Sequence, residues 1–197
     1  MIFDYPEPRS HRRHGPAGYA DYESYREWLR DEFCFRCVYC LKRESWGRVT
    51  GDFELDHFEP QSAHPEKTLD YENLVYSCRT CNLTKSSNSI DDPFEVLHSE
   101  SLRCNPDGRL VAFSAEANRL ILVMDLNSPQ AVEWRLMWLR ITSMARLNDS
   151  SLHTMLVGFP RNLPALGRKQ PPSNSRPEGI DESWYEKQRR NELPTSY

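Results

Sequence analysis

Two cysteine pairs, Cys37-Val-Tyr-Cys40 and Cys78-Arg-Thr-Cys81, enclose the dipeptide Asp56-His57, and the second pair runs directly into Asn82. Two Cys-x-x-Cys turns have the spacing of a structural zinc site, in which four thiolates surround the ion tetrahedrally and leave no open position. The enclosed carboxylate, imidazole and amide are side chains that can hold a second, harder cation and activate a water molecule beside it. The stretch therefore predicts a zinc scaffold that carries a hydrolytic site.

The identity of the zinc ligands is open at one position, because Cys34-Phe-Arg-Cys37 is also a Cys-x-x-Cys. We favour Cys37 and Cys40, which lie nearer the predicted hairpin, whereas Cys34 falls at the end of a predicted helix. Cys34 and Cys104 are then buried or incidental thiols. The alternative use of six cysteines is a disulfide scaffold, which the paired spacing disfavours.

Composition and charge limit the class of protein. The chain has 197 residues, 38% of them hydrophobic, and 14 prolines, which predicts one domain with extensions or two small ones around a modest core. The formal net charge is −4, and residues 56–100 carry 9 acidic but only 3 basic side chains, so the acid surrounds the predicted cation site. The chain shows neither a secretory leader nor an apolar window long enough for a membrane span, so we expect a cytoplasmic protein.

The first half is predicted to contain a helix and a hairpin beside the two knuckles. Asp21 is placed to cap a helix over residues 22–34, whose aromatic stripe is better explained by core packing than by binding. Gly51-Asp52 is a turn signal inside a hairpin over residues 46–58. The remaining elements of this half are a loop over 59–72, a strand over 74–76 and a short helix over 82–88.

The second half changes pattern after Gly108. Leu110-Val-Ala-Phe113 and Leu120-Ile-Leu-Val-Met124 are predicted strands, and Ser128-Pro129 is a good start for a helix that runs to about Leu147. Trp134 and Trp138 on that helix either complete the core, which we favour, or dock another chain. The rest is predicted as a helix over 151–157, a mobile proline-rich stretch over 159–180 and a short helix within 181–197.

These elements predict four parts along the chain. They are a flexible arm (1–20), a core with the zinc site (21–100), a strand pair and helix that pack on the core or a partner (101–158), and a mobile proline-rich tail (159–197).

The individual site candidates each have a second explanation. Adjacent side chains on a strand point to opposite faces, so Asp56 and His57 reach one site only at a strand end or bulge. His57 is a natural base for taking a proton from water, and Asp56 is a hard oxygen ligand. Asn82 delivers an oxygen to the same cation or caps a helix, and Asn73 ties down the long loop or is a turn residue. Lys85 meets a phosphate of the substrate or is solvated.

Taken together, these residues resemble the HNH endonuclease family in its zinc-bearing four-cysteine form. The matching run covers roughly residues 34–90, under a third of the chain, and comprises Cys37-Val-Tyr-Cys40, Leu55-Asp-His-Phe-Glu-Pro60, Asn73-Leu-Val75 and Cys78-Arg-Thr-Cys81-Asn82-Leu-Thr-Lys85. Order, spacing and chemical type all agree, so the resemblance is specific.

The resemblance implies an α+β fold, namely a small ββα-metal finger on a zinc-knuckle scaffold with helical N- and C-terminal extensions. It implies that His57 is the general base, that Asn73 orients the loop, and that Asp56 and Asn82 ligate the catalytic cation. Asn82 stands where the family uses His or Asn, which favours Mg²⁺ or Mn²⁺ over a softer metal. The implied reaction is hydrolysis of DNA phosphodiester bonds, with a 5′-phosphate and a 3′-hydroxyl as products.

Partners are less well specified. DNA is the expected substrate, although a preference for RNA stays open, and Arg9–His14 with Arg161, Arg168 and Lys169 are candidate backbone contacts without a base code. Small bacterial members of the family often serve in anti-phage defence, sometimes beside an ATPase, so a defence effector with such a partner is an inference by analogy. The main alternative is a non-catalytic zinc module that binds nucleic acid or protein.

Overall fold

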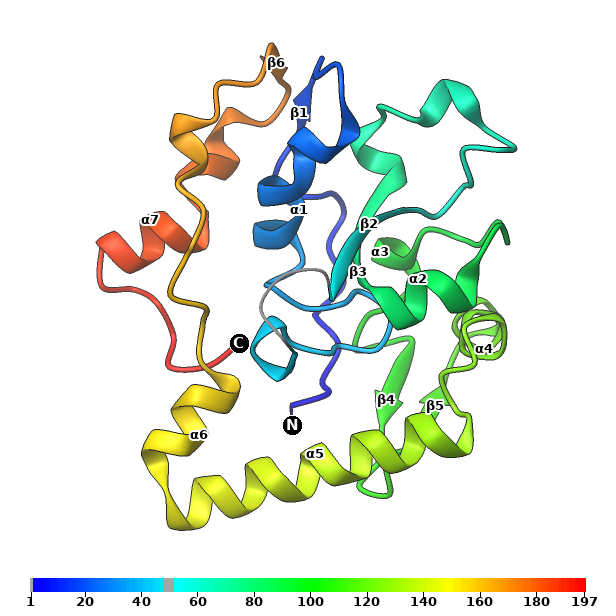
Figure 1. The fold of residues 1–197 in the computed structure, drawn as a ribbon, viewed down its shortest axis with the longest axis vertical. Helices are drawn as coiled ribbons and strands as arrows, with labels where there is room; N and C mark the ends of the chain where they lie inside the picture. The colour runs from blue at the N-terminus through cyan, green and yellow to red at the C-terminus, as the bar shows by residue number, and fades with distance from the viewer. Residues whose placement is uncertain (1, 48–51) are drawn as a thin grey trace.

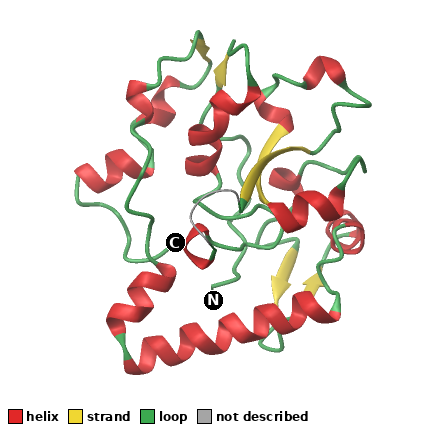
Figure 2. Cartoon of the chain, in the orientation of Figure 1, coloured by secondary structure: helices red, strands yellow, loops and turns green. Residues whose placement is uncertain are grey.

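The computed structural model describes residues 2–47 and 52–197. Short strands in pairs alternate with helices, and one long helix runs along the lower edge of the molecule (Figures 1 and 2). This mixture, together with a cluster of four cysteines, confirms the α+β class. None of the helices in the described ranges is long and apolar enough to cross a membrane.

The centre of the fold is an antiparallel strand pair followed by a helix. Strand β2 (Phe53–His57) pairs with β3 (Leu74–Cys78), so that Phe53 lies opposite Cys78 and His57 opposite Leu74. Helix α2 (Arg79–Lys85) follows β3 without a break and contacts both strands. The hairpin therefore has one end at the cysteines and the other end at His57.

The hairpin predicted over residues 46–58 is tested only in part, because most of its first run, residues 48–50, lies outside the described residues. Its second run is β2, which pairs with β3, and Glu44–Trp46 forms a single 3-10 turn, η2. The predicted turn at Gly51 lies outside the described residues. The backbone N–H of Val38 donates to the carbonyl of Tyr76, so the first knuckle is bound to β3.

The helix predicted over residues 22–34 is present as a 3-10 turn, η1 (Tyr22–Tyr25), that continues into α1 (Arg26–Glu32). The side chain of Asp21 accepts a hydrogen bond from the Glu23 N–H, as expected of a cap. Tyr25 and Leu29 are fully buried and α1 packs against β3, which confirms that the aromatic stripe belongs to the core.

The prediction of two strands after Gly108 is half wrong. Short helix α3 (Pro93–Val96) precedes β4 (Leu102–Cys104), and β4 pairs with β5 (Leu110–Ala112). The run Leu120–Met124 belongs instead to the end of α4 (Ala115–Val123) and its cap. The Ser114 side chain caps this helix, and burial recurs with helical spacing at Ala117, Leu120, Ile121 and Met124. A short apolar run does not by itself distinguish strand from helix.

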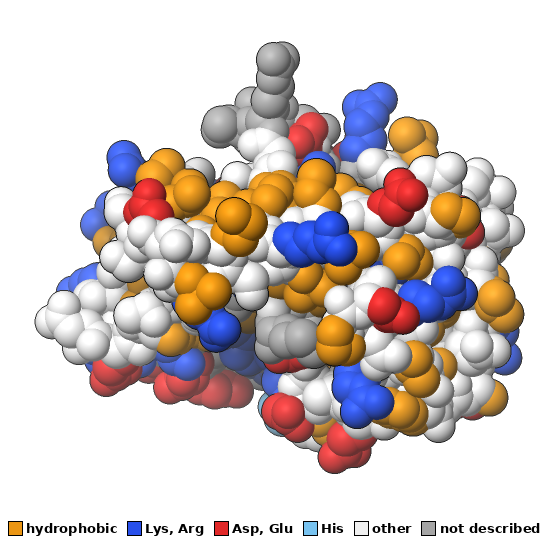
Figure 3. Space-filling view, turned by 90° about the horizontal axis from the view of Figure 1, so that it is seen from below, with side chains coloured by type: hydrophobic (Ala, Val, Ile, Leu, Met, Phe, Trp, Pro, Cys, Tyr) orange, Lys and Arg blue, Asp and Glu red, His pale blue; other side chains and the backbone are white. Residues whose placement is uncertain are grey.

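The long helix is α5 (Pro129–Asn148), capped by Ser128 as predicted, and α6 (Ser150–Val157) follows it. Trp138 stacks on Trp46 with ring centroids 4.2 Å apart, and Trp134 packs edge-on against the same ring, so both tryptophans complete the core. The opposite side of these two helices forms part of the underside of the molecule and carries exposed apolar side chains (Figure 3).

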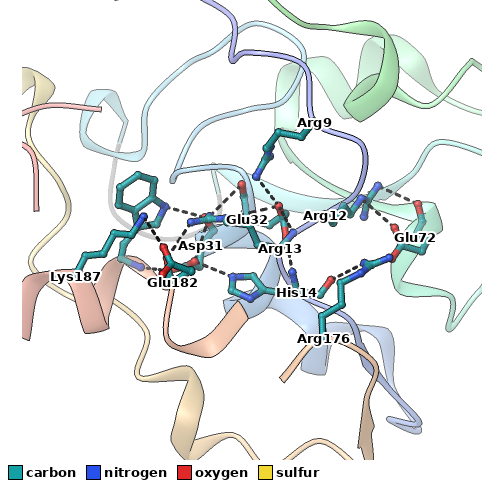
Figure 4. A network of polar contacts seen from close by, with 11 residues as sticks. Arg9, Arg12, Arg13, His14, Asp31, Glu32, Glu72, Arg176, Glu182 and Lys187 are labelled. Carbon is teal, nitrogen blue, oxygen red and sulfur yellow. Dashed lines mark hydrogen bonds and ion pairs between the residues drawn. The ribbon is translucent and has the colours of Figure 1, made fainter. Parts of the chain in front are cut away.

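Both ends of the described chain pack beside α1 (Figure 4). Strand β1 (Pro16–Ala17) pairs with β6 (Ser173–Asn174), and two 3-10 turns, η5 (Leu166–Arg168) and η6 (Pro177–Ile180), lead to α7 (Trp184–Arg189). Buried Asp31 binds His14 Nε2 at 2.8 Å and the backbone N–H of Trp184 at 2.9 Å. The structure thus packs on the core the two segments that were expected to be an arm and a mobile tail. The four-part division itself stays a prediction.

Candidate functional site

The four predicted zinc ligands come together at one end of the hairpin. The Sγ atoms of Cys37, Cys40, Cys78 and Cys81 all lie within 4.8 Å of one another, and those of Cys40 and Cys78 are 3.8 Å apart. Leu41 has a positive φ of 59° and donates its backbone N–H to the Cys37 carbonyl, which closes the first knuckle.

The donor set fits a zinc ion. Zn–S bonds of about 2.3 Å in a tetrahedron place the sulfur atoms roughly 3.8 Å apart, which matches the Cys40–Cys78 separation. Hydrogen bonds from the other three thiols, Cys37 first, hold the pKa of Cys78 far below its ordinary value, so a thiolate is favoured there. Within the described ranges Cys34 and Cys104 lie outside the cluster, so Cys34 replaces neither Cys37 nor Cys40 as a ligand. All six cysteines of these ranges are free, which excludes the disulfide alternative.

Asp56 lies on β2 with both carboxylate oxygens occupied. The Tyr39 hydroxyl donates to Oδ2 at 2.6 Å, and the ammonium of Lys85 lies 3.0 Å from Oδ1. Burial raises the pKa of Tyr39 well above its ordinary value and the charge of Asp56 raises it further, so Tyr39 remains a donor. Lys85 is only 1% exposed, so its ammonium neutralises a buried carboxylate and is not solvated.

Asn82 lies inside α2, whose N-cap is Cys78, so the alternative that Asn82 caps a helix is excluded. Its Nδ2 donates to Glu54 Oε2 at 2.6 Å. Glu54 precedes Asp56 by two positions on β2 and so lies on the same side of the strand, facing α2. Our reading of the sequence missed Glu54, although the spacing Glu54-x-Asp56 within a predicted strand was a usable signal.

His57 is the last residue of β2 and makes a different set of contacts. Its Nε2 lies 2.9 Å from the carbonyl oxygen of Thr68 and 3.2 Å from Gln61 Nε2, and its ring packs edge-on against Tyr22. A carbonyl oxygen only accepts, so Nε2 carries the hydrogen in the shorter contact, with Thr68, and the donor-only Gln61 amide nitrogen then makes no hydrogen bond to it; the lone pair of the neutral ring is on Nδ1. This tautomer leaves Nδ1 as the basic nitrogen.

Asn73 holds the loop that begins after His57. Its Oδ1 accepts from the Glu59 N–H and its Nδ2 donates to the Glu59 carbonyl, both at 3.0 Å, while the Phe58 N–H donates to the Asn73 carbonyl. Asn73 therefore ties down the long loop, which is the first of the two explanations given for it.

Arg12 was expected, within Arg9–His14, to contact a nucleic-acid backbone, but it is buried at this end of the hairpin and binds the protein's own backbone. Its guanidinium is 1% exposed and donates to the carbonyls of Tyr71 and Leu74 at 2.7 and 2.6 Å and to that of Glu72 at 2.9 Å. These carbonyls flank Asn73 in the 3-10 turn η4 (Tyr71–Asn73) and at the start of β3. No local pattern pointed to this role, because the partners of Arg12 lie about sixty residues away.

The predicted residues thus form two groups on one hairpin. Asp56, Asn82 and Lys85 meet at the side that faces α2, together with Glu54. Within the part of the chain that the structure describes, no hydrogen bond or ion pair joins His57 to Asp56 or Asn82. Convergence of all three on one cation stays a prediction.

Comparison with known proteins agrees with the motif. Residues 37–88 match the family model described as HNH endonuclease, which confirms the resemblance over that segment and implies nuclease activity and metal binding. No curated protein matches the chain.

Proposed function

We propose, from the HNH match over residues 37–88, that the protein is a metal-dependent endonuclease that hydrolyses phosphodiester bonds of DNA. One observation carries the proposal. The four-sulfur cluster at one end of β2 and β3 anchors the same short hairpin and helix that present His57, Asp56 and Asn82. A zinc ion there is structural, because four protein sulfurs leave no position for substrate.

The residues that face α2 suit the catalytic cation. Glu54, Asp56 and Asn82 offer carboxylate and amide oxygens, which are the ligands that Mg²⁺ and Mn²⁺ prefer. When bound, such an ion supplies positive charge that stabilises the phosphate during hydrolysis. Lys85 already neutralises Asp56 Oδ1, so a cation at that oxygen competes with the ammonium, and the released Lys85 is then available to a substrate phosphate.

His57 is the proposed general base. The Thr68 carbonyl fixes the hydrogen on Nε2 and orients the ring, so that Nδ1 can take a proton from the attacking water. Asn73 supports this arrangement indirectly, because it fixes the loop between His57 and Thr68 through Glu59.

The test is nicking of supercoiled plasmid DNA by purified protein with Mg²⁺ or Mn²⁺. His57→Ala should lower the rate by about 10²–10⁴-fold, the usual contribution of a general base, and leave the zinc content unchanged. His64→Ala is the matched control, because His64 lies on the same loop but is 36% exposed at its side chain and contacts only carboxylates. Full cleavage by His57→Ala would rule out the assigned base.

The same assay separates the proposal from its main alternative. A non-catalytic zinc module would bind nucleic acid or protein without metal-dependent cleavage, and His57→Ala would change nothing. Single-stranded DNA and RNA substrates in parallel reactions determine the preferred nucleic acid. A role in anti-phage defence beside an ATPase rests on analogy with other small family members.

A further inference from the structure

Exposed apolar side chains concentrate on the outer side of α5 and α6. Twelve large hydrophobic residues of the described chain are exposed, and half of them lie between positions 137 and 155. We call this set the α5–α6 face; it comprises Met137, Ile141, Met144, Leu147, Leu152 and Met155. Figure 3 views the molecule from this side.

The face is a second apolar side of α5 and is not used by the core. Met137, Ile141 and Met144 follow one another at helical spacing and are 47%, 37% and 66% exposed. The buried positions of α5 lie on the other side, where Trp138 stacks on Trp46 and Ala145 is covered. A helix that is apolar on two sides indicates a second surface to be covered, because one side alone suffices to pack on the core.

The charges beside the face are basic. A groove of about 460 Å³ runs along a neighbouring flank of α5; its lining includes Arg140, Arg146 and His153 but no carboxylate and none of the six residues of the face. The only acidic residue between positions 137 and 157 is Asp149, whose side chain caps α6 by accepting from the Leu152 N–H. Glu133 is exposed one turn before Met137, so the basic stretch beside the face begins after it and runs from Arg140 to His153.

We propose that the α5–α6 face binds an acidic amphipathic helix of a partner protein. The apolar side of such a helix covers Met144 and Leu147, and its carboxylates pair with Arg140 and Arg146. Met137, Met144 and Met155 are three of the five methionines in the chain, and their flexible thioethers suit a surface that adapts to an inserted helix.

The charges and the apolar side chains disfavour the other two occupants. A second copy in a two-fold dimer offers Arg140 and Arg146 only Glu133 and Asp149 as counter-charges, and Asp149 already caps α6. A nucleic acid satisfies the arginines but offers phosphate, not apolar surface, to Met144 and Leu147. The proposal does not depend on nuclease activity, because none of these residues belongs to the HNH segment.

The test is site-specific photo-crosslinking in cells that express the full chain. A photoreactive amino acid replaces Met155, and the cross-linked peptide is identified by mass spectrometry. The matched control is Leu122 on α4, which is 70% exposed, as Met155 is, but lies outside the face. The expected product is an acidic amphipathic segment of another protein, formed at position 155 and not at position 122. A product with this chain itself, a product with nucleic acid, or none above the control overturns the proposal.

A second measurement tests the charge argument with purified protein. Binding of two short synthetic amphipathic helices, one with glutamate and one with lysine on the polar side, is followed by fluorescence anisotropy. The wild-type protein should bind the glutamate peptide at least tenfold more tightly, and the double variant Arg140→Glu and Arg146→Glu should reverse that preference. Equal binding of the two peptides, or no reversal in the double variant, contradicts an acidic occupant.

Discussion

The two ends of the β2–β3 hairpin are held by different chemistry. At the Phe53–Cys78 end, four sulfurs from two short turns are placed for one metal ion. At the His57–Leu74 end, the loop is held by hydrogen bonds, from Asn73 to Glu59 and from Arg12 to the carbonyls on either side of Asn73. One end therefore depends on local sequence and a metal, and the other on an arginine from a distant segment.

This difference explains why the residue spacing in the sequence predicts the cysteine end of the hairpin but not the end at Asn73. Metal ligation needs only the right side chains at short separations, and both knuckles satisfy this within four residues each. A backbone carbonyl accepts from any donor that reaches it, so the sequence around Asn73 does not identify its donor. The predictions that follow test whether the two ends are independent.

The largest effect should come from the metal-held end. Removal of zinc by a strong chelator, or Cys81→Ser, should unfold the hairpin, because structural zinc typically contributes about 10 kcal/mol or more and strands of five residues cannot replace it. The measurement is thermal unfolding by circular dichroism with zinc content by atomic absorption. Cys104→Ser, a buried cysteine outside the cluster, serves as control and should keep its zinc. An unchanged melting temperature after zinc loss would show that the hydrogen-bonded end holds the hairpin alone.

The next effect should come from Arg12→Met. The variant leaves the carbonyls of Tyr71, Glu72 and Leu74 without their donor, which costs roughly 3 kcal/mol at about 1 kcal/mol per bond. We expect the kcat of DNA cleavage to fall. The zinc content should stay unchanged, because the substitution does not touch the cysteine end of the hairpin. Arg9→Met is the matched control in the same segment, since the Arg9 side chain is 32% exposed, pairs with Glu32 and lies over the Phe94 ring, and binds none of the carbonyls that Arg12 holds. Loss of zinc from Arg12→Met would mean that the two ends are coupled.

A smaller effect is expected for Asn73, which forms the same end from within the loop. Asn73→Ala removes both hydrogen bonds to Glu59 and should lower the free energy of unfolding by about 2 kcal/mol, measured by urea titration. Asn73→Asp keeps an acceptor for the Glu59 N–H but sets a second acceptor against the Glu59 carbonyl. If Asn73→Asp is as stable as the wild type, the hydrogen bond from Asn73 Nδ2 to the Glu59 carbonyl does not contribute to stability.

The smallest effect concerns pH and the packing of the N-terminal segment. Burial opposes ionisation of Glu32, but Arg13, His14 and Arg9 outweigh it and hold the pKa of Glu32 below its ordinary value of 4.5. The stabilisation by this ionised carboxylate is thus fully present above pH 4.5 and is lost as the pH falls through the lowered value. Compared with Glu32→Gln, the wild type should be more stable by about 1.5 kcal/mol at neutral pH, and the difference should shrink in acid. A difference that persists at low pH, where carboxylates are protonated, would contradict the charge-based explanation.

Particular residues show what could be predicted from the sequence. The knuckles, β3, the Asp21 and Ser128 caps and the start of α5 follow from local chemistry, and all are present. The end of α4 was assigned wrongly, because Leu120–Met124 is as apolar as a buried strand. Only the helical spacing of the apolar residues from Ala117 onward indicates a helix.

The site was predicted in its residue types but not in its contacts. Lys85 was expected at a phosphate or in solvent, whereas it neutralises Asp56, and Glu54 was not considered. Both facts depend on how α2 crosses β2, and this crossing is a long-range property that periodicity does not encode. The same holds for Asp31, which binds His14 and Trp184 from opposite ends of the chain.

The contact between Lys85 and Asp56 determines whether folding needs the proposed divalent cation. A buried carboxylate normally needs a counter-charge from somewhere, and here the chain supplies its own. The fold therefore does not depend on a divalent ion at Asp56, and we expect loading of the proposed catalytic cation to alter cleavage and not folding.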